Sequence, residues 1–170
     1  GATALTAERN PALKGEALGK AQGVFDASVA ASKDVVAFGF QESETVRCWR
    51  WNEAGWAPVP LTGLEGPCTA LAFGSLLFAA HGNVVAAYVE GSAIVAPETR
   101  PVMELAAFAQ KPACAALLQG GSACLFTLED GALEETLLVK VSDAISVSTW
   151  RDAVVVLDAQ GMVSFHRGAA

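Results

Sequence analysis

Residues 76–90 read LLFAAHGNVVAAYVE: an apolar run, a short polar turn, and a second apolar run that contains Tyr88. Short apolar runs on either side of a turn with Gly and Asn are typical of two buried β-strands joined as a hairpin. The same arrangement occurs three more times in the chain. The other copies are AFGFQESETVRCWRW (37–51), CAALLQGGSACLFTL (114–128) and AVVVLDAQGMVSFHR (153–167). We therefore expect a repeat protein.

An aromatic residue marks the second apolar run of each copy. These markers are Trp49, Tyr88, Phe126 and Phe165, and they lie 39, 38 and 39 residues apart. A further apolar run precedes each hairpin, so first strands are expected at Val24–Ala31, Cys68–Phe73, Val102–Phe108 and Ala144–Trp150. A fourth strand is expected in the first three units, at Trp56–Leu61, Ser92–Ala96 and Leu133–Val139. Four strands in about 40 residues, repeated, indicate the blades of a β-propeller.

The predicted fold class is all-β, a β-propeller-type array of about four four-stranded blades that forms part of a larger propeller; the alternative is a compact four-blade body. A β-sandwich would also contain many short strands, but it would not repeat every 39 residues. The predicted division is an N-terminal tail or linker at 1–22, which could supply a closing strand, and blades at 23–66, 67–100, 101–139 and 140–170. Pro11 and Gly15 interrupt the Ala-rich N-terminal stretch, so no long helix is expected there.

The composition excludes several classes of protein. Of 170 residues, 52% are hydrophobic and 17% are charged, whereas disordered chains combine low hydrophobicity with high charge. Much of the hydrophobic fraction is Ala, which is small, so we expect less core than the percentage suggests. The longest mainly apolar stretch, 70–80, is shorter than the ~20 residues of a membrane-spanning helix. No signal peptide is recognisable, so a location in the cytoplasm or nucleus and no membrane contact are expected.

The four Cys residues stand singly, at positions 48, 68, 114 and 124. They form no CxxC pair and no Cys–His spacing of the kind that binds zinc, so no metal or other cofactor is expected. We expect four reduced, buried thiols, because free Cys is among the most buried residue types.

The units between residues 24 and 170 resemble the WD-repeat β-propeller family. In that family a Gly-His pair opens the blade, an Asp sits in the turn before the third strand, and Trp-Asp closes that strand. The best match is 61–71 followed by 76–88, with Leu64 in place of the His and Tyr88 in place of the Trp. Asp158–Phe165 resembles the turn and third strand, and only Trp49 keeps the Trp itself. The family's His-to-Trp hydrogen-bond relay is therefore not expected here.

A narrower resemblance concerns residues 111–126, 141–145 and the final unit. These are weakly similar to the C-terminal blades of zinc-finger CCCH proteins that carry WD repeats. No stretch of the chain matches the finger itself, so zinc and RNA binding are not transferred to any of its residues.

A cluster of Arg and Trp is the candidate partner-binding site, formed by Arg47, Trp49, Arg50, Trp51 and Trp56. Side chains alternate along a strand, which places Arg47, Trp49 and Trp51 on one face and Cys48 and Arg50 on the other. Arg and Trp are enriched at binding hot spots, and Arg and aromatic side chains can also stack on bases. Alternatively, the Trp side chains pack between blades and the aliphatic stems of the Arg residues cover them.

The sequence contains no recognisable catalytic constellation. His81 and His166 are expected to be solvent-exposed, Gly120–Gly121 is expected to be a hairpin turn, and the acidic residues around Gly131 are expected to be solvated. We expect no enzyme activity, although an enzyme that uses a central propeller pocket is a third hypothesis.

The function that the repeat predicts is a non-catalytic WD-repeat-like scaffold that mediates protein–protein interactions. Its expected partners are other proteins or peptides, with nucleic acid contacted only indirectly, because the formal net charge is -7. The alternative is a module of a nucleic-acid-associated protein whose zinc finger lies outside this chain. Self-association of an incomplete ring is a further expectation, because it would cover exposed sheet faces and edges.

Overall fold

The computed structural model describes residues 27–32, 35–40, 46–64, 66–138 and 143–167. This part of the chain contains fifteen β-strands and no helix, which confirms the all-β class. The predicted tail at 1–22, its closing strand, and positions 24–26 of the first predicted strand lie outside the described residues.

The strands form four antiparallel meanders, which we call blades 1 to 4 in chain order. Blade 1 contains β1 (Ala27–Ser32), β2 (Val35–Phe40), β3 (Arg47–Asn52) and β4 (Gly55–Val59). Blade 2 contains β5 (Ala70–Phe73), β6 (Leu77–His81), β7 (Val84–Val89) and β8 (Ser92–Val95). Blade 3 contains β9 (Val102–Ala107), β10 (Ala113–Leu118), β11 (Ser122–Glu129) and β12 (Ala132–Leu137). Blade 4 contains β13 (Ala144–Trp150), β14 (Ala153–Asp158) and β15 (Val163–Arg167).

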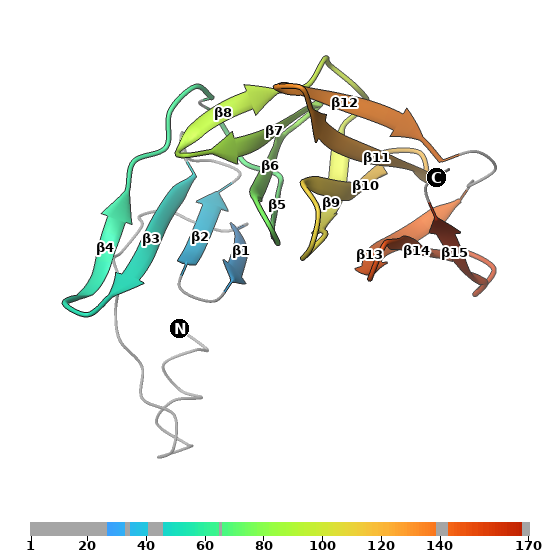
Figure 1. The fold of residues 1–170 in the computed structure, drawn as a ribbon. Helices are drawn as coiled ribbons and strands as arrows, with labels where there is room; N and C mark the ends of the chain where they lie inside the picture. The colour runs from blue at the N-terminus through green and yellow to red at the C-terminus, as the bar shows by residue number, and fades with distance from the viewer. Residues whose placement is uncertain (1–26, 33–34, 41–45, 65, 139–142, 168–170) are drawn as a thin grey trace.

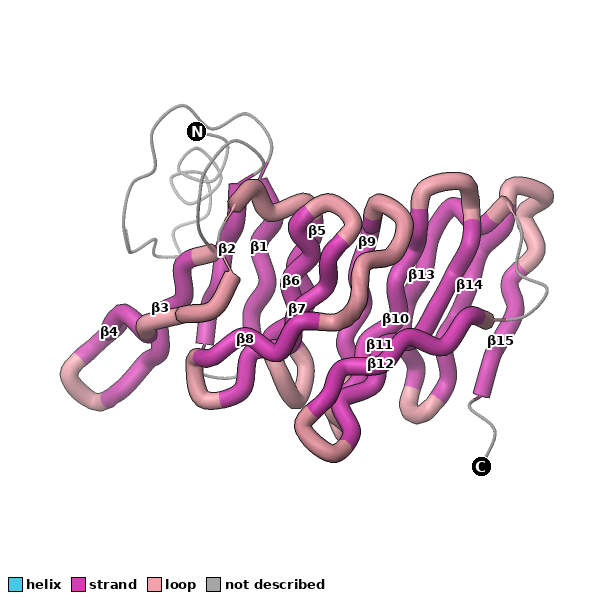
Figure 2. The backbone as a smooth tube through the Cα atoms, turned by 90° about the horizontal axis from the view of Figure 1, so that it is seen from above, coloured by secondary structure: helices cyan, strands magenta, loops and turns pink. Residues whose placement is uncertain are grey.

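The blades stack side by side in an open arc. The first strand of each blade lies on the inner side of the arc, where β1 contacts β5, β5 contacts β9, and β9 contacts β13 (Figure 1). The strands β4, β8 and β12 run along the outside (Figure 1). Figure 2 shows the same chain-order succession from above. Among the described residues, blades 1 and 4 do not pack against each other, so these four blades do not close a ring.

Three apolar clusters fill the junctions between successive blades. Phe78 and Phe126, both fully buried, lie at the junction of blades 2 and 3, among small side chains such as Ala80 and Ala87. Many of the alanines have no exposed surface at all. Small side chains contribute here because they let neighbouring sheets approach closely enough to bury the larger aromatic ones.

Backbone hydrogen bonds connect the linker segments to neighbouring blades. The linker after blade 1 pairs with β8: Thr62 N–H donates to Gly91 O, and Ala93 N–H donates to Thr62 O, both at 2.8 Å. At the other end of the array, Ala144 N–H donates to Gly121 O at 2.9 Å. These bonds join consecutive blades along the arc.

The fourth aromatic marker, Phe165, departs from the repeat. Tyr88 and Phe126 are 6% and 0% exposed and face the preceding blade, whereas Phe165 is 61% exposed. The register pairs Phe165 with Val155, while the alternate residues Val154 and Val156 pack on blade 3. Phe165 therefore points away from blade 3. The 39-residue spacing correctly located the strand but not the face on which its aromatic side chain lies.

Candidate functional site

The Arg/Trp cluster belongs to the β3–β4 hairpin of blade 1. A tight turn joins the two strands, and Ala54 N–H donates to Asn52 Oδ1 at 2.9 Å within it. Trp51 and Trp56 are directly paired across the hairpin, with ring centroids 5.5 Å apart in an edge-to-face arrangement. Such aromatic pairs stabilise a hairpin beyond the area that they bury.

The structure divides the five candidate residues between two faces of blade 1. Arg50 and Cys48 face blade 2, because their register partners Val35 and Ala37 belong to the core cluster shared with that blade. Arg47, Trp49 and Trp51 alternate with them and lie on the opposite face. Their exposure differs, since Trp51 is 48% exposed whereas Trp49 is buried. The cluster is therefore not one continuous binding surface.

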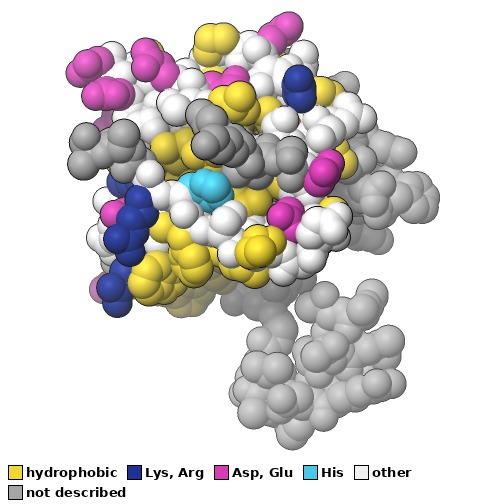
Figure 3. Space-filling model, turned by 90° about the vertical axis from the view of Figure 1, so that its right-hand side faces the viewer, with side chains coloured by type: hydrophobic (Ala, Val, Ile, Leu, Met, Phe, Trp, Pro, Cys, Tyr) yellow, Lys and Arg dark blue, Asp and Glu magenta, His cyan; other side chains and the backbone are white. Residues whose placement is uncertain are grey.

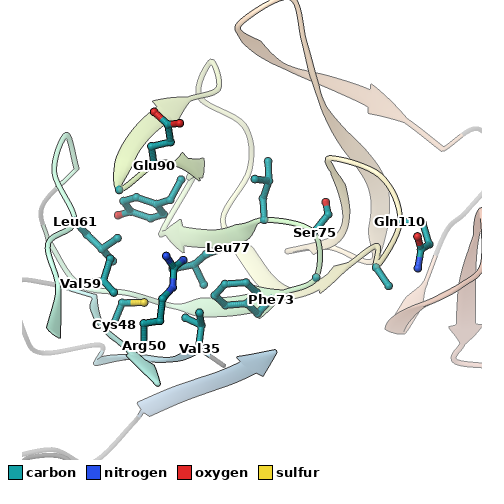
Figure 4. A pocket seen from close by; sticks show the side chains of 15 residues that line it. Val35, Cys48, Arg50, Val59, Leu61, Phe73, Ser75, Leu77, Glu90 and Gln110 are labelled. Atoms are coloured by element: carbon teal, nitrogen blue, oxygen red, sulfur yellow. The ribbon is translucent and has the colours of Figure 1, made fainter. Parts of the chain in front are cut away.

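A pocket of about 860 Å³ lies between blades 1 and 2, at the end of the blades where β2 begins and β3 ends. We call it the blade 1–2 pocket. Figure 4 shows its labelled side chains, which come from both blades and from the β9–β10 turn of blade 3. Its apolar lining comprises Val35, Cys48, Val59, Leu61, Phe73, Leu76, Leu77 and Tyr88. Its polar contributions come from Arg50, Ser75, Glu90 and Gln110.

Two charged side chains, Arg50 and Glu90, lie on opposite sides of this pocket (Figure 4). Arg50 projects from β3 among the apolar side chains, and Glu90 lies beyond the end of β7 (Figure 4). Among the described residues no ion pair joins Arg50 to a carboxylate. Burial raises the pKa of the Cys48 thiol, with a smaller opposing effect of Arg50, and burial together with Cys68 raises the pKa of Tyr88 to about 12. At neutral pH the pocket therefore offers one cation, one carboxylate and neutral thiol and phenol groups.

All four thiols are free and buried, as the sequence predicted. Burial raises the pKa of Cys68 to about 11, and its Sγ donates to Ala70 O at 3.3 Å. Burial also raises the pKa values of Cys114 and Cys124. Since the thiolate is the reactive form, burial makes these groups poor nucleophiles at neutral pH.

The two histidines are not solvent-exposed turn residues, so that expectation was wrong. His81 is partly buried, its Nδ1 donates to Gly66 O at 3.0 Å, and its Nε2 is buried without a hydrogen-bond partner. His166 is also partly buried and shares a 2.8 Å hydrogen bond with Ser164 Oγ. The contact of His81 joins the turn between β6 and β7 to the linker before β5, a long-range contact that a local pattern does not reveal.

The buried ring of His81 makes stability depend on pH. Burial lowers its pKa below 6.5, and hydrogen bonds to the carbonyls of Gly66 and Pro67 oppose the shift only in part. The unfolded chain therefore binds this proton more readily, so the stability due to neutral His81 is complete above pH ~6.5 and falls as the pH drops below that value. We expect the urea midpoint of His81→Gln to fall less between pH 7 and pH 5 than that of the wild type. His166→Gln, the matched control, should keep the wild-type fall, and an equal fall in all three would contradict the assignment.

Other candidate groups in the described residues have structural surroundings. Glu129, Asp130 and Glu134 are exposed at the β11–β12 hairpin, and Glu135 Oε1 accepts from Thr99 Oγ1 at 3.0 Å. Within the described ranges no group of three or more His, Cys, Asp or Glu side chains could hold a metal ion. The same residues include no helix of sufficient length and apolarity to cross a membrane.

No protein-family model and no curated protein matches the sequence. Solved structures do match. The computationally designed Ika4 protein has 17% identity and a TM-score of 0.68, over 91% of this chain and 100% of its own. The β-propeller domain of Cps50 (Swd1) from Myceliophteria thermophila has 15% identity and a TM-score of 0.68, over 89% of this chain and 55% of its own. The chain folds as four blades of a β-propeller.

A third match shows how much of a propeller these four blades represent. Prp20p from Saccharomyces cerevisiae has 16% identity and a TM-score of 0.57, over 81% of this chain and 44% of its own. The propeller described here thus spans the whole of Ika4 but about half the length of the Swd1 domain and of Prp20p. At these identities the likeness concerns the fold. The resemblance to zinc-finger CCCH proteins gains no support from it.

The sequence missed most of the blade 1–2 pocket. Phe73, Ser75 and Gln110 are single residues at the ends of short strands or in turns, in segments far apart in sequence. A usable signal was the repeat itself, because strand ends of successive blades meet at the same face of a propeller. The pattern did not show which junction leaves space between its side chains.

Proposed function

We propose that this propeller is a non-catalytic, WD-repeat-like protein-interaction scaffold, and that it docks an extended segment of another protein in the blade 1–2 pocket. The observation that carries the proposal is Arg50, an exposed cation without a carboxylate partner among the described residues, beside a largely apolar hollow. Of the five Arg/Trp candidates, Arg50 alone lines this pocket.

The pocket favours a particular peptide chemistry. Its apolar lining, including Leu61, Phe73 and Leu76, would take a medium-sized apolar side chain. A carboxylate next to that side chain would pair with Arg50, and Glu90 on the other side disfavours a run of several acidic residues. The proposed ligand is therefore an extended segment with one apolar residue beside one Asp or Glu. The net charge of -7 makes bare nucleic acid a poor alternative.

The matched structures support protein partners in general. Prp20p binds Gsp1p and histones, and a second structure holds Kap60 bound to the same yeast protein. Protein binding by this matched protein fits a scaffold role for the present chain, acting in the cytoplasm or nucleus. The neutral, buried thiols and the surroundings of both histidines favour docking over catalysis.

Replacing Arg50 is expected to weaken docking selectively. Peptides would be selected from a displayed random library on the 170-residue chain, and the affinity of the best one measured by calorimetry. We expect selected peptides to carry an apolar residue next to Asp or Glu, and Arg50→Ala to weaken binding by about tenfold, or about 1.4 kcal/mol. Leu61→Trp, which fills the pocket, should also weaken binding.

The control for this experiment is Arg100→Ala. Arg100 is an exposed Arg that contacts Ser122 and lies remote from the pocket. Its affinity for the selected peptide should match the wild type. Peptides without an acidic residue, or equal effects of Arg50→Ala and Arg100→Ala, would show that the pocket is not the docking site.

A further inference from the structure

Exposed apolar side chains concentrate at the end of the arc formed by blade 4. The large hydrophobic residues that are exposed there are Ile145, Trp150, Met162, Val163 and Phe165. Trp150, Val163 and Phe165 are 47%, 52% and 61% exposed, and the rings of Trp150 and Phe165 meet edge to face at 6.1 Å. Figure 3 faces this end of the propeller and shows hydrophobic side chains gathered along its lower edge, beside a column of Lys and Arg.

The strand register shows that these residues form one sheet face. Val154 and Val156 of β14 pack on blade 3, so the alternate residues Val155 and Leu157 point the other way. Phe165 is paired with Val155 and Val163 with Leu157, which places all four on the face turned away from blade 3. Every other blade in the array packs its corresponding face on the blade that follows it. The face of blade 4, which we call the trailing face, has no such cover among the described residues.

Blade 1 presents the complementary situation at the opposite end. In blades 2 and 3 the third-strand aromatics Tyr88 and Phe126 are buried against the preceding blade. The residue of blade 1 at the same repeat position is Trp49, which is also buried, and the same face, which we call the leading face, carries Trp51, which is 48% exposed, and its partner Trp56. The repeat therefore gives blade 1 an aromatic face of the kind that packs on a preceding blade elsewhere in this chain.

We propose that a second copy of this chain covers both faces, so that two copies close one ring of eight blades. The trailing face of each copy would pack on the leading face of the other, continuing the blade-to-blade junction that the array already uses three times. Such head-to-tail contacts form a closed ring when the rotations from one blade to the next add up to a full circle. Eight blades lie within the range of known propellers. The matched part of this chain covers 55% of the Swd1 propeller domain and 44% of Prp20p, which is about half of each.

The mass of the 170-residue chain in solution tests this proposal. Size-exclusion chromatography with light scattering should give twice the chain mass of 17.5 kDa at micromolar concentration. Phe165→Glu on the trailing face and Trp51→Glu on the leading face should each raise the dimer dissociation constant by at least about tenfold. Val95→Glu, at a position 44% exposed on the outer strand of blade 2, should leave the dimer unchanged.

Mixing the two variants separates a ring from other dimers. A mixed pair has one junction made of two unaltered faces, so the mixture should recover dimer that neither variant forms alone. Because both replaced side chains are exposed, far-ultraviolet circular dichroism should match the wild type, and if one variant unfolds the other still reports. A wild-type mass of one chain, masses that grow without limit, or equal behaviour of Phe165→Glu and Val95→Glu would each overturn the proposal.

Discussion

Replacing Phe126 by alanine is expected to lower the free energy of unfolding by about 3–5 kcal/mol, the range for large-to-small changes of buried aromatics. Phe126 has no exposed surface and packs in the core cluster that joins blades 2 and 3. Its neighbours there include Phe78, Cys114 and Leu133, which lie on three different strands. Because these strands are held in hydrogen-bonded sheets, they cannot collapse fully into the space that the ring leaves.

Urea unfolding followed by circular dichroism measures this loss. The matched control is Met103→Ala, because Met103 is 59% exposed on β9 of the same blade and its truncation should cost less than about 1 kcal/mol. A loss for Phe126→Ala as small as the control would mean that blades 2 and 3 do not share this core. A loss near the expected range is a large part of the ~5–15 kcal/mol that stabilises a typical domain.

The second large effect is expected for Gly74→Ala, with a loss of about 2–3 kcal/mol. Gly74 lies in the turn between β5 and β6, and a Cβ at this position would overlap the carbonyl group of Phe108 in blade 3. That carbonyl accepts a 2.9 Å hydrogen bond from Ser75 N–H, and Ser75 Oγ donates to Lys111 O at 2.7 Å. An added methyl group would therefore push apart the two blades at a point where hydrogen bonds join them.

The control for Gly74→Ala is the same substitution at Gly82. A Cβ on Gly82 meets nothing within 4 Å, although its φ of +66° makes any side chain cost about 1 kcal/mol. Thermal unfolding of the two variants should show the larger drop in midpoint for Gly74→Ala. If Gly82→Ala were the more damaging change, the close approach of blades 2 and 3 at Phe108 would be wrong.

The repeat made the positions of the strands predictable from the sequence. The predicted strand Ala144–Trp150 coincides with β13, and Ser92–Ala96 differs from β8 by one residue. Strand ends were less certain, as for Cys68–Phe73, where β5 begins at Ala70. Apolar runs and turn residues are local signals, so they indicate where each strand lies. The 39-residue interval between the first two markers indicates how consecutive blades follow one another along the chain.

Contacts between blades were not predictable in the same way. The sequence correctly placed Arg47 and Arg50 on opposite faces of one strand, because alternation is a local property. It did not reveal that Arg50 borders a pocket, since many of the other lining residues come from blade 2 and from the β9–β10 turn of blade 3. It also misjudged His81, whose hydrogen-bond partner Gly66 lies in the linker that precedes β5. These properties depend on how sheets are spaced, which a pattern within one unit does not contain.

The most direct test of the proposed docking function is photo-crosslinking from the rim of the blade 1–2 pocket. A photoreactive amino acid would replace Gln110, which lines the pocket, or Gln119, which is exposed in the β10–β11 turn at the other end of the blade. Each chain would be irradiated with the peptide selected on the wild type. We predict a covalent adduct from position 110 and none from position 119. Equal adducts from both positions, or an adduct from position 119 alone, would contradict docking at this pocket.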